Sequence, residues 1–173
     1  VVNCEVNPIP ANTGAPTVSD NCDAAPVVTV LSDNTVQDPD CPQAKTISRT
    51  FQVADHCGNS STCLQIIAIQ DTTRPVIICP NNITIECDES TAPSNTGSAL
   101  ASDNCDQSPV ITHTNLPATP LGGCSFNRKF VRVWLAGDAC DNGSLCQQTI
   151  TILDTEGPLV SCPASVTIEC GSD

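Results

Sequence analysis

The sequence predicts an all-β chain made of two tandem, disulfide-stapled β-sandwich modules. Three observations lead to this fold class: cysteines recur at a constant spacing, short β-branched segments alternate with turn residues, and no amphipathic helix of useful length occurs. Because all three hold in both halves of the 173-residue chain, the halves are expected to share one fold.

The cysteines form seven pairs whose members lie 83 residues apart without a gap. Chance does not produce so many matches, so the chain is predicted to be a tandem array of six-cysteine modules. Residues 1–73 form a first module that lacks its opening strand, and residues 74–156 form the second. Residues 157–173 are the opening strand segment of a following module and are expected to complement the next subunit. The pairs are Cys4 and Cys87, Cys22 and Cys105, Cys41 and Cys124, Cys57 and Cys140, Cys63 and Cys146, Cys79 and Cys162, and Cys87 and Cys170.

Seven segments are predicted to be short strands because β-branched residues are frequent in them and roughly alternate with polar ones. Proline, glycine, asparagine, aspartate and serine fill the intervals, which is typical of turns. Arg49 and Arg132 share strand parity with Phe51 and Trp134, so each arginine should point inward and stack on an aromatic ring or pair with a carboxylate. The strands are expected at 27–31, 47–53, 64–69, 83–87, 110–115, 130–136 and 147–153.

The composition predicts an extracellular or cell-surface protein. Thirteen cysteines accompany only four aromatic residues, so disulfides are expected to offset a small apolar core, as in oxidising compartments. The formal net charge of −13 excludes a nucleic-acid partner, which needs a basic surface, but suits divalent cations. No apolar run approaches the ~20 residues of a membrane span.

Several short motifs together resemble the hyalin repeat (HYR), an immunoglobulin-like module, in the cysteine-rich form found in arrays of bacterial extracellular surface and filament proteins. The motifs are Cys79-Pro80, Asp103-Asn104, and the run from Asp138 to Asn142 followed by Cys146. Seven or so strands per module are also typical of an immunoglobulin-like sandwich. The resemblance implies a Cys79–Cys146 disulfide. Residue 141 is aspartate where the family usually has glycine, which Gly58 keeps in the first module.

The remaining cysteine pairings are inferred from topology. The loop after the second strand and the loop before the last strand lie at one end of such a sandwich, which favours Cys105–Cys140 and Cys22–Cys57. This leaves Cys87–Cys124 and Cys4–Cys41, with a local Cys57–Cys63 bridge as the alternative. Cys63 is expected to bond Cys162 of another subunit or of a following module, and Cys170 has no assigned partner.

The same loops concentrate oxygen ligands that calcium prefers. The alternative is that these side chains form Asx turns with the backbone. Asp71 and Asp154, at the predicted junctions, could add ligands between modules. The candidate calcium ligands are Asp20, Asn21, Asp23 and Asp55 in the first module and Asp103, Asn104, Asp106 and Asp138 in the second.

Modification motifs are also present. Asn59, Asn82 and Asn142 head N-glycosylation sequons, and Thr72 lies in an Asp-Thr-Thr run similar to a bacterial O-glycosylation signal. The alternatives are a Gly-Asn turn and an ordinary linker.

No catalytic constellation is evident. His56 adjoins Cys57, but Ala139 replaces the histidine in the second module, and no nucleophile-elbow, zincin or phosphate-loop motif occurs. We therefore expect a non-enzymatic stalk or filament in which copies meet head to tail. The alternative is an adhesive module that binds a surface glycan or protein through its loop end, which a lack of exposed aromatics disfavours.

Overall fold

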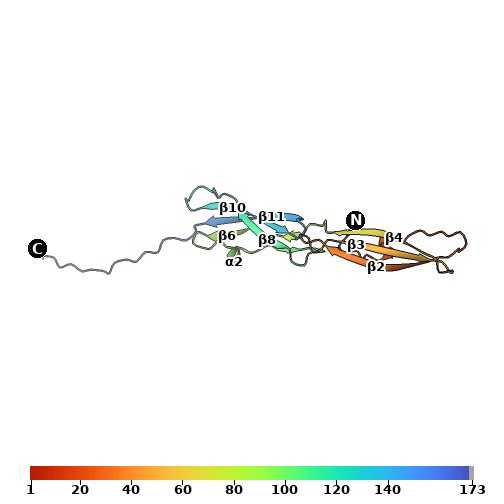
Figure 1. The fold of residues 1–173 in the computed structure, drawn as a ribbon. Helices are drawn as coiled ribbons and strands as arrows, with labels where there is room; N and C mark the ends of the chain where they lie inside the picture. Colours follow the sequence, from red (N-terminus) through yellow and green to blue (C-terminus); the bar gives the residue numbers. More distant parts are fainter. Residues whose placement is uncertain (172–173) are drawn as a thin grey trace.

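The computed structural model describes residues 1–171, and nearly all of its regular structure is β-strand, which confirms the predicted all-β class. Two modules lie end to end, and the segment after the second extends away from it (Figure 1). No helix among the described residues is long and apolar enough to cross a membrane.

The first module contains one four-stranded sheet in the order β1-β4-β3-β2. Its three long strands are antiparallel neighbours, and β1 adds parallel to the end of β4. One helical turn, α1 (Pro10–Thr13), precedes the long strands. The strands are β1 (Val2–Asn3), β2 (Val27–Gln37), β3 (Lys45–Ala54) and β4 (Ser60–Gln70).

The second module repeats this sheet and adds another to form a sandwich-like fold. Its main sheet has the order β6-β11-β10-β8, with β9 paired to β10, and β5 pairs with β7 in a separate two-stranded sheet. A helical turn, α2 (Pro93–Thr96), matches α1. The strands are β5 (Val76–Ile78), β6 (Ile83–Glu86), β7 (Leu100–Ser102), β8 (Val110–Asn115), β9 (Thr119–Pro120), β10 (Arg128–Gly137) and β11 (Gly143–Leu153).

Most observed strands are longer than the predicted ones, while β8 has the predicted bounds and β6 ends one residue earlier. β2 continues six residues past its predicted end because a register shift after Val30 lets it follow β3 to Gln37. β1, β5, β7 and β9 were not predicted, since three residues or fewer show no readable alternation.

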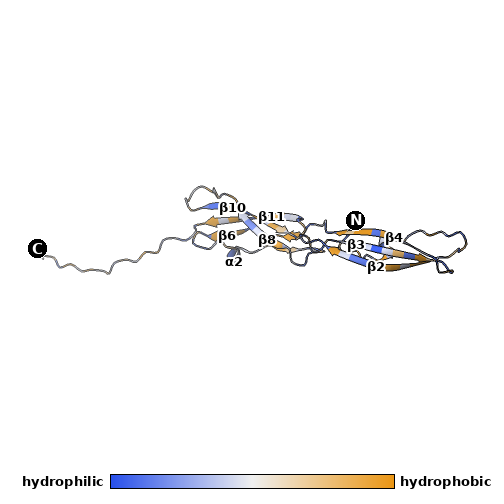
Figure 2. Cartoon of the chain, in the orientation of Figure 1, coloured by the Kyte–Doolittle hydropathy of each residue, from blue (hydrophilic) through white to orange (hydrophobic). Residues whose placement is uncertain are grey.

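Each module has a small apolar core. Apolar residues, buried and exposed alike, appear as orange bands on the strands in Figure 2. Ile47, Ile67 and Ile69 form the buried cluster of the first module. The buried cluster of the second module comes from three strands, β6, β10 and β11, rather than two. It contains Ile85, Phe130, Ile150 and Ile152.

The two arginines point inward, as predicted from strand parity. Arg49 is 3% exposed and pairs with Asp33 at 2.7 Å, and its guanidinium lies 5.9 Å from the centre of the Phe51 ring. Arg132 is 1% exposed and lies over both Phe130 and Trp134. Each therefore acts as a polar centre of its module's core.

Candidate functional site

Two disulfides join the facing ends of the modules. Cys4 bonds Cys105 with their Cα atoms 6.0 Å apart, and Cys41 bonds Cys140 with their Cα atoms 4.6 Å apart. The first module supplies one cysteine beside β1 and one from the β2–β3 turn, while the second supplies loop cysteines. Two covalent ties plus a short linker containing Pro75 restrict motion at this joint.

These bonds correct the predicted pairings. The structure contains Cys79–Cys146, as the family resemblance implies, with a Cα separation of 5.8 Å. Cys105–Cys140 and Cys4–Cys41 are wrong. The two loops do lie at one end of the sandwich, but their cysteines face the neighbouring module rather than each other.

The other cysteines are free thiols in the described part of the chain. The predicted Cys22–Cys57 and Cys87–Cys124 bonds are therefore not formed, and neither is the alternative Cys57–Cys63 bridge. The predicted Cys63–Cys162 bond joins separate units and stays a prediction. All seven are exposed except the half-buried Cys124: they are Cys22, Cys57, Cys63, Cys87, Cys124, Cys162 and Cys170.

Three carboxylates meet at the joint. One oxygen from each of Asp71, Asp103 and Asp138 lies within 4.8 Å of the other two. Asp71 is only 6% exposed, and buried Oδ2 atoms of both Asp71 and Asp103 have no hydrogen-bond partner. Unpaired buried oxygens are costly unless a proton or a cation joins them.

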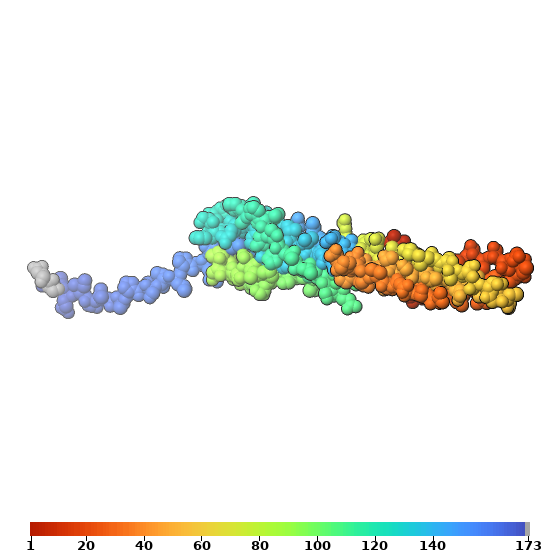
Figure 3. All heavy atoms as spheres, in the orientation of Figure 1, coloured from red at the N-terminus to blue at the C-terminus, as the bar shows by residue number. Residues whose placement is uncertain are grey.

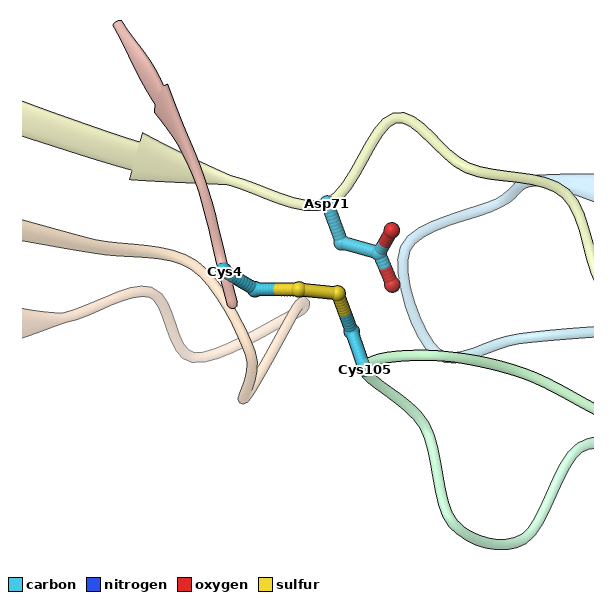
Figure 4. A group of neighbouring side chains, drawn as sticks. All are labelled: Cys4, Asp71 and Cys105. Atoms are coloured by element: carbon cyan, nitrogen blue, oxygen red, sulfur yellow. A yellow bond between two sulfur atoms is a disulfide. The ribbon is translucent and has the colours of Figure 1, made fainter. Parts of the chain in front are cut away.

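Burial is the main cause that raises the pKa of Asp71, and the nearby carboxylates of Asp103, Asp138 and Asp106 raise it further. The backbone amide of Thr73, which donates to Asp71 Oδ1 at 3.0 Å, acts in the opposite direction. The Cys4–Cys105 disulfide borders this carboxylate (Figure 4). Its sulfurs are bonded to each other, so they offer no thiolate ligand.

The other predicted calcium ligands of the second module point elsewhere. Asp106 accepts the backbone amides of Ser108 at 2.8 Å and Ala139 at 3.1 Å. Asn104 donates across the joint to Asn3 Oδ1 at 3.5 Å. The joint therefore gathers two of the four predicted ligands and adds Asp71, which the sequence suggested only as a supplementary ligand.

In the first module the predicted ligands are engaged in turns. Asp20 Oδ1 accepts the amides of Cys22 and Asp23, and Asp55 Oδ1 accepts those of Cys57 and Asn59. Asn21 is exposed. No third carboxylate joins Asp20 and Asp55 within residues 1–171. The same Asx turns form at Asp103 and Asp138, so these turns do not decide between the alternatives and calcium at this end stays a prediction.

Asp23 is instead occupied by His56, whose Nδ1 lies 2.7 Å from Asp23 Oδ2. This hydrogen bond raises the pKa of His56 above its ordinary 6.5. The charged pair therefore stabilises the fold at a pH below the ordinary histidine pKa, and its contribution is lost as the pH rises through the pKa of the folded state.

An NMR titration of the His56 imidazole should show the raised midpoint, and Asp23→Asn should lower it. Equal midpoints in both proteins would contradict the pairing.

The first module contains an open groove of about 360 Å³. Residues 16–20 and 59–63 form much of its lining. Their repeat counterparts, residues 99–103 and 142–146, hold β7 and Cys146. In the second module β5 pairs with β7 and lies against β10 and β11, and Cys79 bonds Cys146. The groove is thus the place that β5 and Cys79 fill in the second module.

Two further observations mark this groove as incomplete. Gln148 donates to the carbonyls of Asn81 and Thr96, at 2.9 and 2.6 Å. Its counterpart Gln65 donates to the Thr13 carbonyl alone among the described contacts. Residues 17–19, the counterparts of β7, form no strand because they have no neighbour to pair with.

The sequons differ in accessibility. Asn142 is half-buried at the joint, where its Nδ2 donates to Asp138 Oδ2 and the Asp71 carbonyl, and a glycan there stays a prediction. Asn59 is exposed, although its amide donates to Asp55 Oδ2 at 2.7 Å. Asn82 and Thr72 are exposed.

One aromatic departs from expectation. Phe126, in the loop before β10, is 56% exposed, whereas Phe51, Phe130 and Trp134 are buried. Phe126 is therefore the one exposed side chain among the four aromatic residues of the sequence. The ring centre of His113 lies 4.9 Å from that of the buried Trp134.

Comparison with known proteins gives one informative similarity. No family model matches the chain. The chain is 29% identical to Hyalin from Strongylocentrotus purpuratus over 168 residues, which cover 91% of this chain and 13% of that protein. The similarity supports a hyalin-like chain, and it does not support the bacterial source implied by the resemblance.

Proposed function

We propose that this chain is an extracellular structural protein, a non-enzymatic unit of a stalk or filament that extends head to tail. The open groove of the first module is the observation that carries the proposal. The disulfides and the similarity to Hyalin favour an extracellular location. The modules lie end to end and are joined by two disulfides, an arrangement that suits a load-bearing rod (Figure 3).

The segment from 158 to 166 has the composition needed to fill that groove in another unit. It is the repeat counterpart of residues 75–83, which contain β5 and Cys79. In the structure it is extended, with Leu159 103% and Val160 86% exposed. Inserted as β5 is, it would pair with residues 17–19 and bring Cys162 beside Cys63, completing a sandwich by β-strand addition.

Such a contact uses different surfaces on the two partners. One unit offers its C-terminal segment, and the other offers the groove in its first module. A head-to-tail contact that does not close on itself continues into a filament.

We also propose calcium as a stabilising ion of each joint. Asp71, Asp103 and Asp138 offer oxygen ligands from both sides of the linker, and backbone carbonyls and water can complete a flexible shell. The Asp71 carbonyl is already held by Asn142, so an ion bound to the three side chains would tie linker and loops together.

Changing the segment on its inward face tests the filament proposal. Val160 matches Ile77, which is more buried than its neighbours in β5, whereas Leu159 matches the 65% exposed Val76. Val160→Asp should weaken association at least about tenfold, because it places a negative charge at a partly buried position of a groove that already contains Asp20 and Asp55. Leu159→Asp should leave association unchanged. Light scattering across a concentration series measures both, and monomers at every concentration of the unaltered protein would sink the proposal.

The adhesive alternative has less support. Its loop end would need an exposed recognition patch, and the one exposed aromatic, Phe126, occupies the repeat position of Gln43. Gln43 Oε1 lies 3.5 Å from Cys140 Sγ, at the joint. Phe126 therefore occupies a position that belongs to a module contact.

A further inference from the structure

We infer that two more disulfides, Cys87–Cys22 and Cys124–Cys57, join one unit to a second copy, and this inference rests on the proposed head-to-tail assembly. The joint within the chain supplies the template. There, a pair of cysteines at the end of one module bonds a pair at the beginning of the next. The repeat places the same two pairs at the outer ends of the molecule.

The correspondence is residue by residue. Cys87 and Cys124 match Cys4 and Cys41, the pair that the first module presents to the joint. At the opposite end, Cys22 and Cys57 match Cys105 and Cys140, the pair that the second module presents. All four thiols are free in the structure, and all but the half-buried Cys124 are exposed.

Topology places these pairs at opposite poles. Cys57 lies in the β3–β4 turn, at the end of the sheet away from Gln70 and the joint. Cys87 follows β6, whose last residue, Glu86, pairs with Leu153 at the far end of β11. The outer pole of one unit can therefore meet the opposite pole of another in the way that the two modules meet within the chain (Figure 1).

Neighbouring polar groups recur with the cysteines. At the internal joint Asn142 donates to the Asp71 carbonyl at 3.1 Å. The counterparts are Asn59 at one pole and Asp154 at the other, so the same hydrogen bond can form between copies. Asp154 would also join Asp20 and Asp55, the pair that lacks a third carboxylate, and would rebuild the acidic trio.

The bonds require an oxidant, which a small organic disulfide such as glutathione disulfide supplies. For each new bond two thiols lose two protons and two electrons, and one glutathione disulfide is reduced to two glutathione thiols. The attacking thiolate first forms a mixed disulfide with glutathione, which the second cysteine then displaces. Together with Cys63–Cys162, three covalent ties would cross each contact between copies.

Mixed isotopes test the inference. Unlabelled and 15N-labelled chains are combined, oxidised with glutathione disulfide and digested without reductant, and the linked peptides are identified by mass spectrometry. We expect Cys22–Cys87 and Cys57–Cys124 peptides with one light and one heavy partner. Cys22→Ser combined with Cys57→Ser should remove both kinds, whereas Cys63→Ser should retain them.

The outcomes separate this inference from the proposed function. Mixed Cys63–Cys162 peptides without the other two would overturn the extra disulfides and leave the filament standing. Bonds Cys22–Cys57 or Cys87–Cys124 within one isotope would overturn the inference directly. No mixed peptide of any kind, with monomers in light scattering, would overturn both.

Discussion

Replacing Arg132 with alanine is expected to lower the free energy of unfolding by about 3–5 kcal/mol. The guanidinium is 1% exposed and donates to Asn115 Oδ1, Thr96 Oγ1 and the Thr91 carbonyl at 2.6–2.8 Å. Alanine would leave these acceptors without their donor and open a cavity beneath the aromatic rings. Urea denaturation, followed by the tryptophan fluorescence of Trp134, measures the change.

The first module shows what a charged partner does for the equivalent arginine. Arg49 donates to both carboxylate oxygens of its cross-strand neighbour Asp33, whereas Arg132 donates to its own cross-strand neighbour, the neutral amide Asn115. Burial lowers the pKa of Arg132, while the hydrogen bonds to Asp33 raise the pKa of Arg49. Asn115→Asp should therefore stabilise the second module by about 1 kcal/mol. If Arg132→Ala costs less than about 1 kcal/mol, the arginine is not the polar centre of this core.

The inward arginines show where sequence reasoning succeeds. Strand parity alone places Arg49 beside Phe51 and Arg132 beside Trp134, because alternate residues of a strand share a face. The same local periodicity predicted the long strands. It carries no information on β5 and β7, whose three residues are ordered by pairing with each other rather than by alternation.

The disulfides show where sequence reasoning stops. A repeat fixes each cysteine's place within a module but does not identify which module supplies its partner. Cys105 with Cys140 and Cys105 with Cys4 are equally compatible with the spacing, and only the joint geometry selects the second. Pairing between modules does have one consequence that can be checked: it leaves free cysteines at both outer ends of the chain, and the structure has them there.

The sequence predicted the acidic cluster only in part, because it describes positions within a module and not the contact between modules. Asp103 and Asp138 belong to loops that sandwich topology brings together, so the sequence identified them. Asp71 is a linker residue that is buried at the joint, and no local sequence pattern distinguishes a buried linker carboxylate from an exposed one. Asp106 looked equivalent to Asp103, but turn geometry directs it toward the Ala139 amide instead.

Calcium is expected to raise the melting temperature of the chain by about 5–10 °C, at a free concentration near a hundred times its dissociation constant. The ion would offset two of the three negative charges of carboxylates that lie within 4.8 Å of one another, and it would bind the unpaired oxygens of Asp71 and Asp103. Differential scanning calorimetry with calcium and with a chelator measures the gain. Magnesium should give less, because it dehydrates reluctantly and demands a stricter geometry.

Asp71→Asn distinguishes an ion site from a carboxylate that merely braces the turn. The substitution removes a buried negative charge from the trio, so the chelated protein should melt higher than the unaltered chain, yet lose most of its response to calcium. Asp154→Asn, at the repeat-equivalent and more exposed position, should change neither value in the monomer. A calcium response that survives in Asp71→Asn would place the ion elsewhere. A lower melting temperature with chelator would instead make Asp71 a structural acceptor for the Thr73 amide.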